Sequence, residues 1–485
     1  MKRYGLVLLV LLLTMWGCLM AGFVTIAPNG RYFQHDGTLL VPLGFNDAIS
    51  WPSLAPVVSG DDKGARRYFE EISRSGVNVL RVMFEYAQDR SNVFLMEDPL
   101  GQRNDLLLES WDRILELAEE FGMYLIITPW DPFWAYENWD VNPYNRKNGG
   151  PIDSFREFLT DPGAIENARQ RFSLLVERYG HSENVLAWEL NNEIELWYGK
   201  IFRTPDATVA REVQQWVQTM SAFIRQRERE LYGQAHLVTV STASPALQGT
   251  LARALYNNPS LDFVTTHFYL DGIKKYSDPK TVSEEVVMTI AYHQYVLQTS
   301  QPFMDSESGP IDQWPKSAAH DRACFKSFSW SHLASGGTGI GMRWPYTIPH
   351  RMPSYLLSVI HGVHAFLEAG GINWLHFGAL ENSQSMQVEA DQPVFFAYSV
   401  DTFSENQWAM GWLSSENGKA IQRATLGMEG FAAGEFVLEA WDTDAGVVLA
   451  HWLGRSEGEW LTFQVEGLPA DFAFKVYPRG EKHGE

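Results

Sequence analysis

Two glutamates follow apolar runs that have the composition of buried strands. Glu193 comes after the run 184–190 and is preceded by Asn191 and Asn192, and Glu307 comes after the run 301–304. A pair of carboxyl groups can break a glycosidic bond, because one acid protonates the leaving oxygen while a carboxylate attacks the anomeric carbon or directs water at it. We therefore hypothesise that Glu193 and Glu307 form a site for glycoside cleavage.

Each glutamate has a competing interpretation. Glu193 is also acceptable as a solvated acid in the first turn of a helix, where negative charge is favourable. Glu307 has a neighbouring rival, Asp305, which would point to the same side of an extended strand because side chains alternate with a period of two. The double asparagine at a strand end and the position of Glu307 favour the two glutamates.

The elements that position this pair form a repeating pattern. Eight strand-like runs alternate with amphipathic helical stretches, and they cover residues 41–45, 78–84, 123–129, 184–190, 236–242, 262–267, 302–306 and 338–343. The long helical stretches include 106–121, 164–179, 209–231, 284–297 and 355–367. This alternation predicts a parallel (β/α)8 barrel, whose chemistry lies at the carboxyl ends of the strands. The alternative, an open doubly wound sheet, needs a glycine-rich phosphate turn after the first strand, and residues 44–49 contain none.

The chain divides into a barrel and a smaller β domain. Residues 24–41 read as a hairpin that closes the barrel floor, and the barrel is predicted over residues 23–371. After Gly370 and Gly371 the pattern changes to short alternating strands at 394–400, 408–413, 436–441, 447–452, 460–465 and 472–477. These strands predict a β-sandwich over residues 372–485 that packs rigidly on the barrel.

Several of these motifs resemble a known enzyme family. They are Trp188-Glu-Leu-Asn-Asn192-Glu193, the strand-seven segment 302–309, His267-Phe-Tyr269, Arg81 in Asn78-Val-Leu-Arg81, and Trp344 after strand eight. In this order along a barrel they look like the retaining glycoside hydrolases of clan A, closest to family 5. The segment Phe158-Leu-Thr-Asp-Pro162 is similar to the endo-mannanase branch of that family.

The resemblance implies a role for each residue. Glu193 would be the acid/base and Glu307 the nucleophile, with Arg81 and Tyr269 as hydrogen-bond partners that favour its anionic form. A competing interpretation gives Arg81 a buried acid such as Glu189 to neutralise. The remaining implied site residues are Asn192 at the sugar 2-hydroxyl, His267 near the substrate, and Trp344 as a sugar platform.

The sequence also departs from the family pattern. Ile194 follows the acid/base where proline is common, Ser308 follows the nucleophile where an aromatic is common, and strand three ends in Asp131 where a histidine often sits. These changes leave the paired acids intact, but they bear on the subsite that holds the reacting sugar. The preferred sugar is therefore open.

Tryptophans follow several of the predicted strands. Trp130 and Trp134 come after strand three and Trp344 after strand eight, so all three are candidates for substrate binding. Aromatic faces bind sugars, but a single tryptophan is as often part of the core. Core packing is the alternative for each of them.

Charge and cysteine content narrow the class of partner. Thirty-eight Lys and Arg against 59 Asp and Glu leave a net charge of −21, which repels nucleic acids and anionic surfaces. No nucleic-acid partner, cofactor or metal is predicted.

Outside the N-terminal segment Cys324 is the only cysteine, and it falls in a helical pattern where we expect a buried, inert thiol.

The first 22 residues read as an export signal. Lys2 and Arg3 precede an apolar run, and the segment ending at Cys18 resembles a weak lipoprotein motif. We expect an exported protein that is either secreted after cleavage near residue 21 or anchored through Cys18, while a retained membrane anchor remains a third reading.

Together these features predict an exported retaining β-glycoside hydrolase that acts on β-1,4-linked mannan or glucan. An exo-acting β-glycosidase or a transglycosylase of the same clan is the alternative within enzymes. A carbohydrate-binding protein without catalysis is the alternative outside them.

Overall fold

The computed structural model describes most of the chain. The described residues run from 22 to 480 and leave out 87, 89–91, 200–206, 246, 248, 270–277, 310–316, 379–385 and 402–407. Residues 1–21 of the predicted signal segment, including Cys18, lie outside the described residues. None of the described helices is long and apolar enough to cross a membrane.

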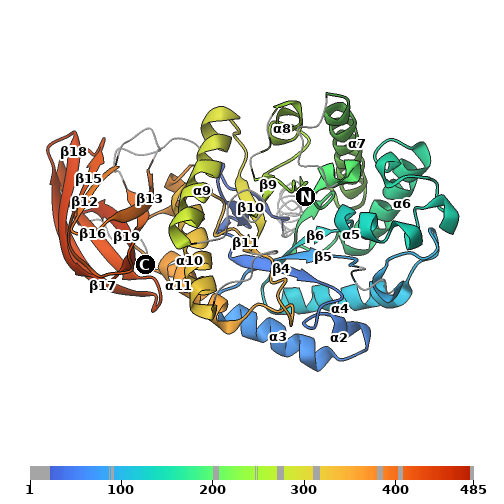
Figure 1. Ribbon diagram of the computed structural model, residues 1–485, viewed down its shortest axis with the longest axis horizontal. Helices are drawn as coiled ribbons and strands as arrows, with labels where there is room; N and C mark the ends of the chain where they lie inside the picture. The colour runs from blue at the N-terminus through green and yellow to red at the C-terminus, as the bar shows by residue number, and fades with distance from the viewer. Residues whose placement is uncertain are drawn as a thin grey trace, which may run out of the picture.

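Eight parallel strands form the barrel at the centre and right of Figure 1. They are β4 (Gly44–Ala48), β5 (Val79–Met83), β6 (Tyr124–Thr128), β7 (Val185–Glu189), β8 (Leu237–Thr239), β9 (Val264–Phe268), β10 (Phe303–Ser308) and β11 (Met342–Arg343). Two hydrogen-bonded sheets, β11-β4-β5-β6-β7-β8 and β10-β9, are joined by backbone bonds from Asp262 N to Val238 O and from Trp344 N to Ser308 O. The predicted (β/α)8 barrel is therefore confirmed, and each predicted strand lies within a few residues of the observed one.

Helices surround the strands. They are α2 (Ala55–Val58), α3 (Asp62–Arg74), α4 (Asp105–Glu120), α5 (Pro132–Glu137), α6 (Pro162–Tyr179), α7 (Ala207–Tyr232), α8 (Gly249–Tyr256), α9 (Pro279–Ala291), α10 (Ala318–Ala334) and α11 (Ser354–Glu368). Most show one buried face, but α10 is buried nearly all round because it lies between the strands and the C-terminal domain. Cys324 lies in α10 and is buried, as expected.

An N-terminal hairpin closes the floor of the barrel. Strands β1 (Thr25–Ile26), β2 (Phe33–His35) and β3 (Thr38–Leu40) form a small antiparallel sheet. The ring of Phe33 meets that of Phe263 edge-on at 5.1 Å, in an apolar cluster with residues such as Val79 and Met304 from the strands. The floor is thus a dry hydrophobic plug.

The C-terminal domain is one antiparallel sheet that folds over itself, drawn in orange and red in Figure 1. Its strands are β12 (Met386–Ala390), β13 (Val394–Val400), β14 (Ala409–Ser415), β15 (Ile421–Glu429), β16 (Gly434–Asp442), β17 (Val447–Ser456), β18 (Trp460–Leu468) and β19 (Asp471–Pro478). Strands β17 and β18 pair over only two residue pairs, so the sheet opens there into two layers around their own core. This arrangement fits the predicted β-sandwich and adds two strands, β12 and β15, to the six that were expected.

The sandwich packs on the barrel through an apolar interface. Lys475 of β19 donates hydrogen bonds to the carbonyls of Ala369 and Gly370, and its ammonium lies 4.7 Å from the ring of Phe366 and 4.9 Å from that of Trp441. Residues of both domains belong to one continuous hydrophobic core. The contact is that of a docked domain.

Candidate active site

The backbone at Glu193 holds its side chain over the carboxyl end of the barrel. Glu193 follows β7 and has φ 42° and ψ 57°, a left-handed conformation that costs a non-glycine residue about 1–2 kcal/mol. The end of β8 supports this turn, because Glu193 N donates to Ser241 Oγ at 3.0 Å and Ile194 N donates to Ser241 O at 3.1 Å. Strain of this kind persists where surrounding structure enforces it, and it is concentrated at functional sites.

A β-bulge separates Glu307 from its rival Asp305. Strand β10 pairs with β9 in a register that shifts between these two acids, so that Asp305 lies opposite Thr266 and Glu307 opposite His267. Asp305 Oδ1 accepts a hydrogen bond from Thr266 Oγ1 at 2.6 Å, and the backbone of Asp305 contacts His332 of α10. Glu307 instead faces the mouth, so the expectation that both acids point to the same side is wrong, because the bulge breaks the period of two.

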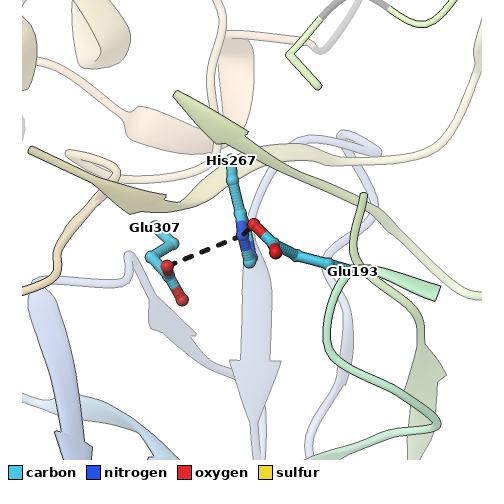
Figure 2. A group of neighbouring side chains, drawn as sticks. All are labelled: Glu193, His267 and Glu307. Carbon is cyan, nitrogen blue, oxygen red and sulfur yellow. Dashed lines mark hydrogen bonds and ion pairs between the residues drawn. The ribbon is translucent and has the colours of Figure 1, made fainter. Parts of the chain in front are cut away.

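The structure brings Glu193 and Glu307 together around His267. One carboxylate oxygen from each glutamate and Nδ1 of His267 all lie within 4.8 Å of one another (Figure 2). Nδ1 is 2.7 Å from Glu193 Oε1 and 3.7 Å from Glu307 Oε1. Within the described part of the chain, these three residues are also the group whose donor atoms have the spacing of a metal site. That no metal is needed stays a prediction.

Arg81 contacts both of the acids that were considered as its partners, Glu307 and Glu189. Its Nε and Nη2 donate to the carboxylate of Glu189 at 2.5 and 2.8 Å. Its Nη1 donates to Glu307 Oε2 at 2.8 Å, and Nη2 also donates to Asn192 Oδ1 at 2.7 Å. The guanidinium is fully buried, so it serves as the fixed positive centre of a largely acidic site.

Burial sets the protonation of the two glutamates. It raises the pKa of Glu193 to about 7, with the nearby Arg81 acting in the opposite direction and Glu189 adding to the rise. Burial also raises the pKa of Glu307, although His267, Arg81 and the hydroxyl of Tyr269, which donates to Glu307 at 2.6 Å, oppose it. Arg81 and Tyr269 thus favour the anion as expected, but the loss of water around Glu307 outweighs them.

An aromatic cluster borders the mouth. The rings of Trp51 and Trp344 are 4.2 Å apart between centroids, and Tyr86 meets both of them edge-on. Trp134 and Tyr269 pack against this cluster. Trp344 therefore belongs to this cluster and has only 5% of its surface exposed, and its role as a sugar platform stays a prediction.

Trp130 lies behind the site wall. It is 3% exposed, packs against Phe158 and Phe172, and has the guanidinium of Arg171 4.9 Å from its ring. Trp130 and Trp134 both line a cavity formed by the loops after β5 and β6. The packing of Trp130 is that of the core, which leaves Trp134 as the half-exposed ring of the two.

Three further polar residues complete the site. Asn46 of β4 accepts from Arg81 Nη1 at 2.8 Å, and Thr128 of β6 donates to Glu189 at 2.9 Å. Asp131, after β6, accepts a hydrogen bond from Asn192 Nδ2 at 3.0 Å. Each stands at or just after a barrel strand, so strand position was the signal that could have pointed to them.

The sequence model of the family described as Cellulase (glycosyl hydrolase family 5) matches residues 46–321, which is more than half of the chain. This chain belongs to glycosyl hydrolase family 5. The resemblance drawn from the motifs after the strands is thereby confirmed.

The curated relatives that match this chain are named as mannan endo-1,4-beta-mannosidases. The chain is 25% identical over 226 residues to mannan endo-1,4-beta-mannosidase 7 of Arabidopsis thaliana, covering 42% of this chain and 49% of that protein. It is 26% identical over 276 residues to mannan endo-1,4-beta-mannosidase A of Hypocrea jecorina, covering 52% and 56%. The chain thus spans about half the length of the curated relatives it matches.

Solved structures share the fold. A glycoside hydrolase family 5 protein from Bacteroides vulgatus superposes with a TM-score of 0.60 at 13% identity, covering 96% of this chain and 95% of that one. A family 5 mannosidase from Rhizomucor miehei gives 0.53 at 17% identity, covering 71% and 97%. The first of these likenesses extends over the barrel and the C-terminal domain together.

Proposed function

We propose that this enzyme is a retaining β-glycoside hydrolase with Glu193 as acid/base and Glu307 as nucleophile. The observation that carries the proposal is the approach of the two carboxylates, whose nearest oxygens lie within 4.8 Å of each other. Retaining enzymes hold their carboxyl groups about 5–5.5 Å apart, whereas inverting enzymes need about 6.5–9.5 Å to admit a water. The close approach of the two carboxylates supports the shorter separation, at which Glu307 attacks the sugar directly without an intervening water.

His267 directs the proton of Glu193. Burial lowers the pKa of His267 to about 4, so its imidazole is neutral at pH 7 and carries one N–H. Its Nε2 is buried without a hydrogen-bond partner among the described residues. If the proton is on Nδ1, Nε2 has only an unpaired lone pair. This costs less than a buried N–H at Nε2 without an acceptor. Nδ1–H then donates to Glu193 Oε1, so the acidic proton of Glu193 resides on Oε2.

The reaction proceeds in two displacements. Glu193 Oε2 protonates the glycosidic oxygen while a Glu307 carboxylate oxygen attacks the anomeric carbon, which releases the first sugar product as an alcohol and leaves a glycosyl ester on Glu307. Glu193 is then anionic and takes a proton from water, whose oxygen attacks the same carbon and frees Glu307. Configuration at the anomeric carbon is retained because it is inverted twice.

The residues around the pair prepare these steps. Arg81 and Tyr269 each hold one oxygen of Glu307, which orients the carboxylate for attack. Asn192 offers its amide next to the pair, where it meets the sugar 2-hydroxyl, and Trp344 supports the sugar ring. His267 keeps Glu193 in place.

A β-1,4-linked mannan is the substrate we favour, with glucan as the second choice. The support is that the curated relatives are mannan endo-1,4-beta-mannosidases. An exo-acting or transglycosylating enzyme remains the alternative within the same chemistry, and a binding protein without catalysis is the alternative outside it.

Two measurements test the proposal. Incubation with β-mannan, β-glucan and xylan, followed by a reducing-sugar assay and sizing of the products, identifies the polymer and separates internal from terminal cleavage. Proton NMR in the first minutes should show the β-anomer of the product before mutarotation. Early α-anomer would reject retention, and no release of sugar from any glycan would reject hydrolysis.

We also propose that the protein is exported, either secreted or held by a lipid at Cys18. The support is the basic start and apolar run of the first 22 residues. The described structure begins at Gly22 beside the floor hairpin, at the opposite end of the barrel from Glu193 and Glu307. Fatty-acid labelling of the wild type and of Cys18→Ala distinguishes the lipidated form from the secreted one.

A further inference from the structure

Asp131 holds the amide of Asn192 from the side opposite Arg81. Arg81 Nη2 donates to Asn192 Oδ1 at 2.7 Å, and Asn192 Nδ2 donates to Asp131 Oδ1 at 3.0 Å. An arginine has only donors and a carboxylate oxygen is an acceptor, so the two ends of the amide cannot exchange places. One N–H of Asn192 is consumed by Asp131, which fixes the direction of the other.

Asp131 is itself held in place. It is the N-cap of α5, with Oδ1 accepting from Phe133 N at 3.0 Å. The backbone also joins the two loops, since Asn192 N donates to Trp130 O at 3.0 Å. Asp131 additionally lines the cavity that Trp130 and Trp134 border. The turn after β6 and the turn after β7 therefore move as one unit.

We propose that Asp131 is a positioning residue that sets the grip of Asn192 on the sugar 2-hydroxyl, and so helps to determine which configuration at C2 is accepted. This inference rests on the proposed function, because it assumes that Asn192 meets the reacting sugar. Mannose and glucose differ only at C2, where the hydroxyl is axial in one and equatorial in the other. A rigid amide directed at that hydroxyl distinguishes them, whereas a freely rotating amide does not.

The test must separate this role from the capping of α5. Serine is as good an N-cap as aspartate but is one atom shorter, so Asp131→Ser retains the cap and loses the reach to Asn192. Asp131→Asn keeps an acceptor oxygen at the same distance and serves as the conservative variant. Melting temperatures of both variants report on folding.

The substrates are 4-nitrophenyl β-mannoside, 4-nitrophenyl β-glucoside and their 2-deoxy analogue. The analogue is one compound, because mannose and glucose become identical when the 2-hydroxyl is removed. We expect Asp131→Ser to lower kcat/KM on the better hydroxylated substrate by about 5- to 100-fold, which is the range for a buried N–H that loses its acceptor. The 2-deoxy substrate should change by less than about threefold, because there is no hydroxyl for Asn192 to hold. Asp131→Asn should stay near the wild type on all three substrates, and Asp131→Ser should cost nothing more when Asn192 is already alanine.

The outcomes separate the two levels of the argument. The positioning role is rejected, while the proposed function stands, if Asp131→Ser cleaves all substrates like the wild type. It is also rejected if kcat/KM falls by the same factor on the 2-deoxy substrate as on the hydroxylated ones. If Asp131→Asn falls as far as Asp131→Ser, the negative charge is responsible and the orientation argument is rejected. If the wild type cleaves none of these glycosides or the β-1,4 oligosaccharides offered in parallel, the proposed function fails and this inference fails with it.

Discussion

The two ends of the barrel are built from the same strands and have opposite chemistry. At the floor, Phe33 and Phe263 pack with other apolar side chains from the hairpin and the barrel strands. At the mouth, Arg81 is buried with Glu189, Glu307 and the raised-pKa acid Glu193. Burying a charge costs several kcal/mol per group, and pairing often repays only part of that cost, so the mouth gives up stability that the floor provides.

Two backbone distortions at the mouth place the two glutamates. The left-handed backbone of Glu193 and the bulge that separates Asp305 from Glu307 both lie at the carboxyl ends of strands. Neither improves packing, and each directs an acid toward the substrate. We therefore expect changes at the mouth to affect activity more than stability, and changes at the floor to do the reverse.

The largest expected effect is the loss of either catalytic acid. Glu307→Ala should lower kcat by at least about 1,000-fold because no covalent intermediate forms, and Glu193→Ala should lose the 100- to 10,000-fold that general acid catalysis contributes (about 2.7–5.5 kcal/mol). Both proteins should melt as cooperatively as the wild type. Initial rates on the best glycan and circular dichroism melting are the measurements, and near-wild-type turnover of either variant would refute the assignment.

The opposite pattern is expected at the floor. Phe33→Ala removes a buried ring and should lower the free energy of unfolding by about 3–5 kcal/mol through lost contacts and a cavity. Its kcat at a temperature where it is folded should match the wild type within about twofold, because the pair at the mouth is untouched. Denaturant unfolding beside initial rates tests this, and a loss of kcat in fully folded Phe33→Ala would break the comparison between the two ends.

The protonation of Glu193 predicts the shape of the pH profile. Glu193 must carry its proton to act as acid, and its pKa is raised to about 7 by burial. The rate should therefore fall above about pH 7, approaching tenfold per pH unit, as the proton is lost from the free enzyme. A profile of kcat/KM from pH 5 to 9 measures this, and a rate that stays level to pH 9 would place the acid elsewhere.

The same shift predicts a gain in stability from a neutral replacement. Glu193 has a folded-state pKa above its ordinary value, so its burial is harmless at low pH and becomes destabilising as the pH rises through about 7. Glu193→Gln should thus be more stable than the wild type at pH 8 by about 1–3 kcal/mol, and the difference should vanish near pH 4. Urea unfolding at both pH values tests this sign, and equal stability at pH 8 would mean that Glu193 is not strained by its burial.

How far the sequence could predict this molecule depends on the kind of interaction. The order of barrel strands and the placement of Glu193 and Glu307 at their ends followed from apolar runs and from the residues after them. Arg81 lies in the middle of β5, and only the resemblance to the family pointed to it. The bulge in β10 has no sequence signature, so Asp305 remained a rival until the pairing with β9 was seen. The partnership of Asp131 with Asn192 joins two loops 61 residues apart and depends on the closed barrel.

The smallest expected effect is at Asp305, which shares a strand with Glu307 but not its face. Asp305 is fully buried, accepts from Thr266 Oγ1 at 2.6 Å and has a pKa raised to about 7 by burial, so a neutral side chain of the same shape is tolerated there. Asp305→Asn should retain kcat within about fivefold and be as stable as the wild type or slightly more so at pH 8, since an amide oxygen can still accept from Thr266. Rates and unfolding curves measured beside Glu307→Gln decide the matter. If Asp305→Asn lost as much activity as Glu307→Gln, the bulge would not separate the two acids and the nucleophile would move to Asp305.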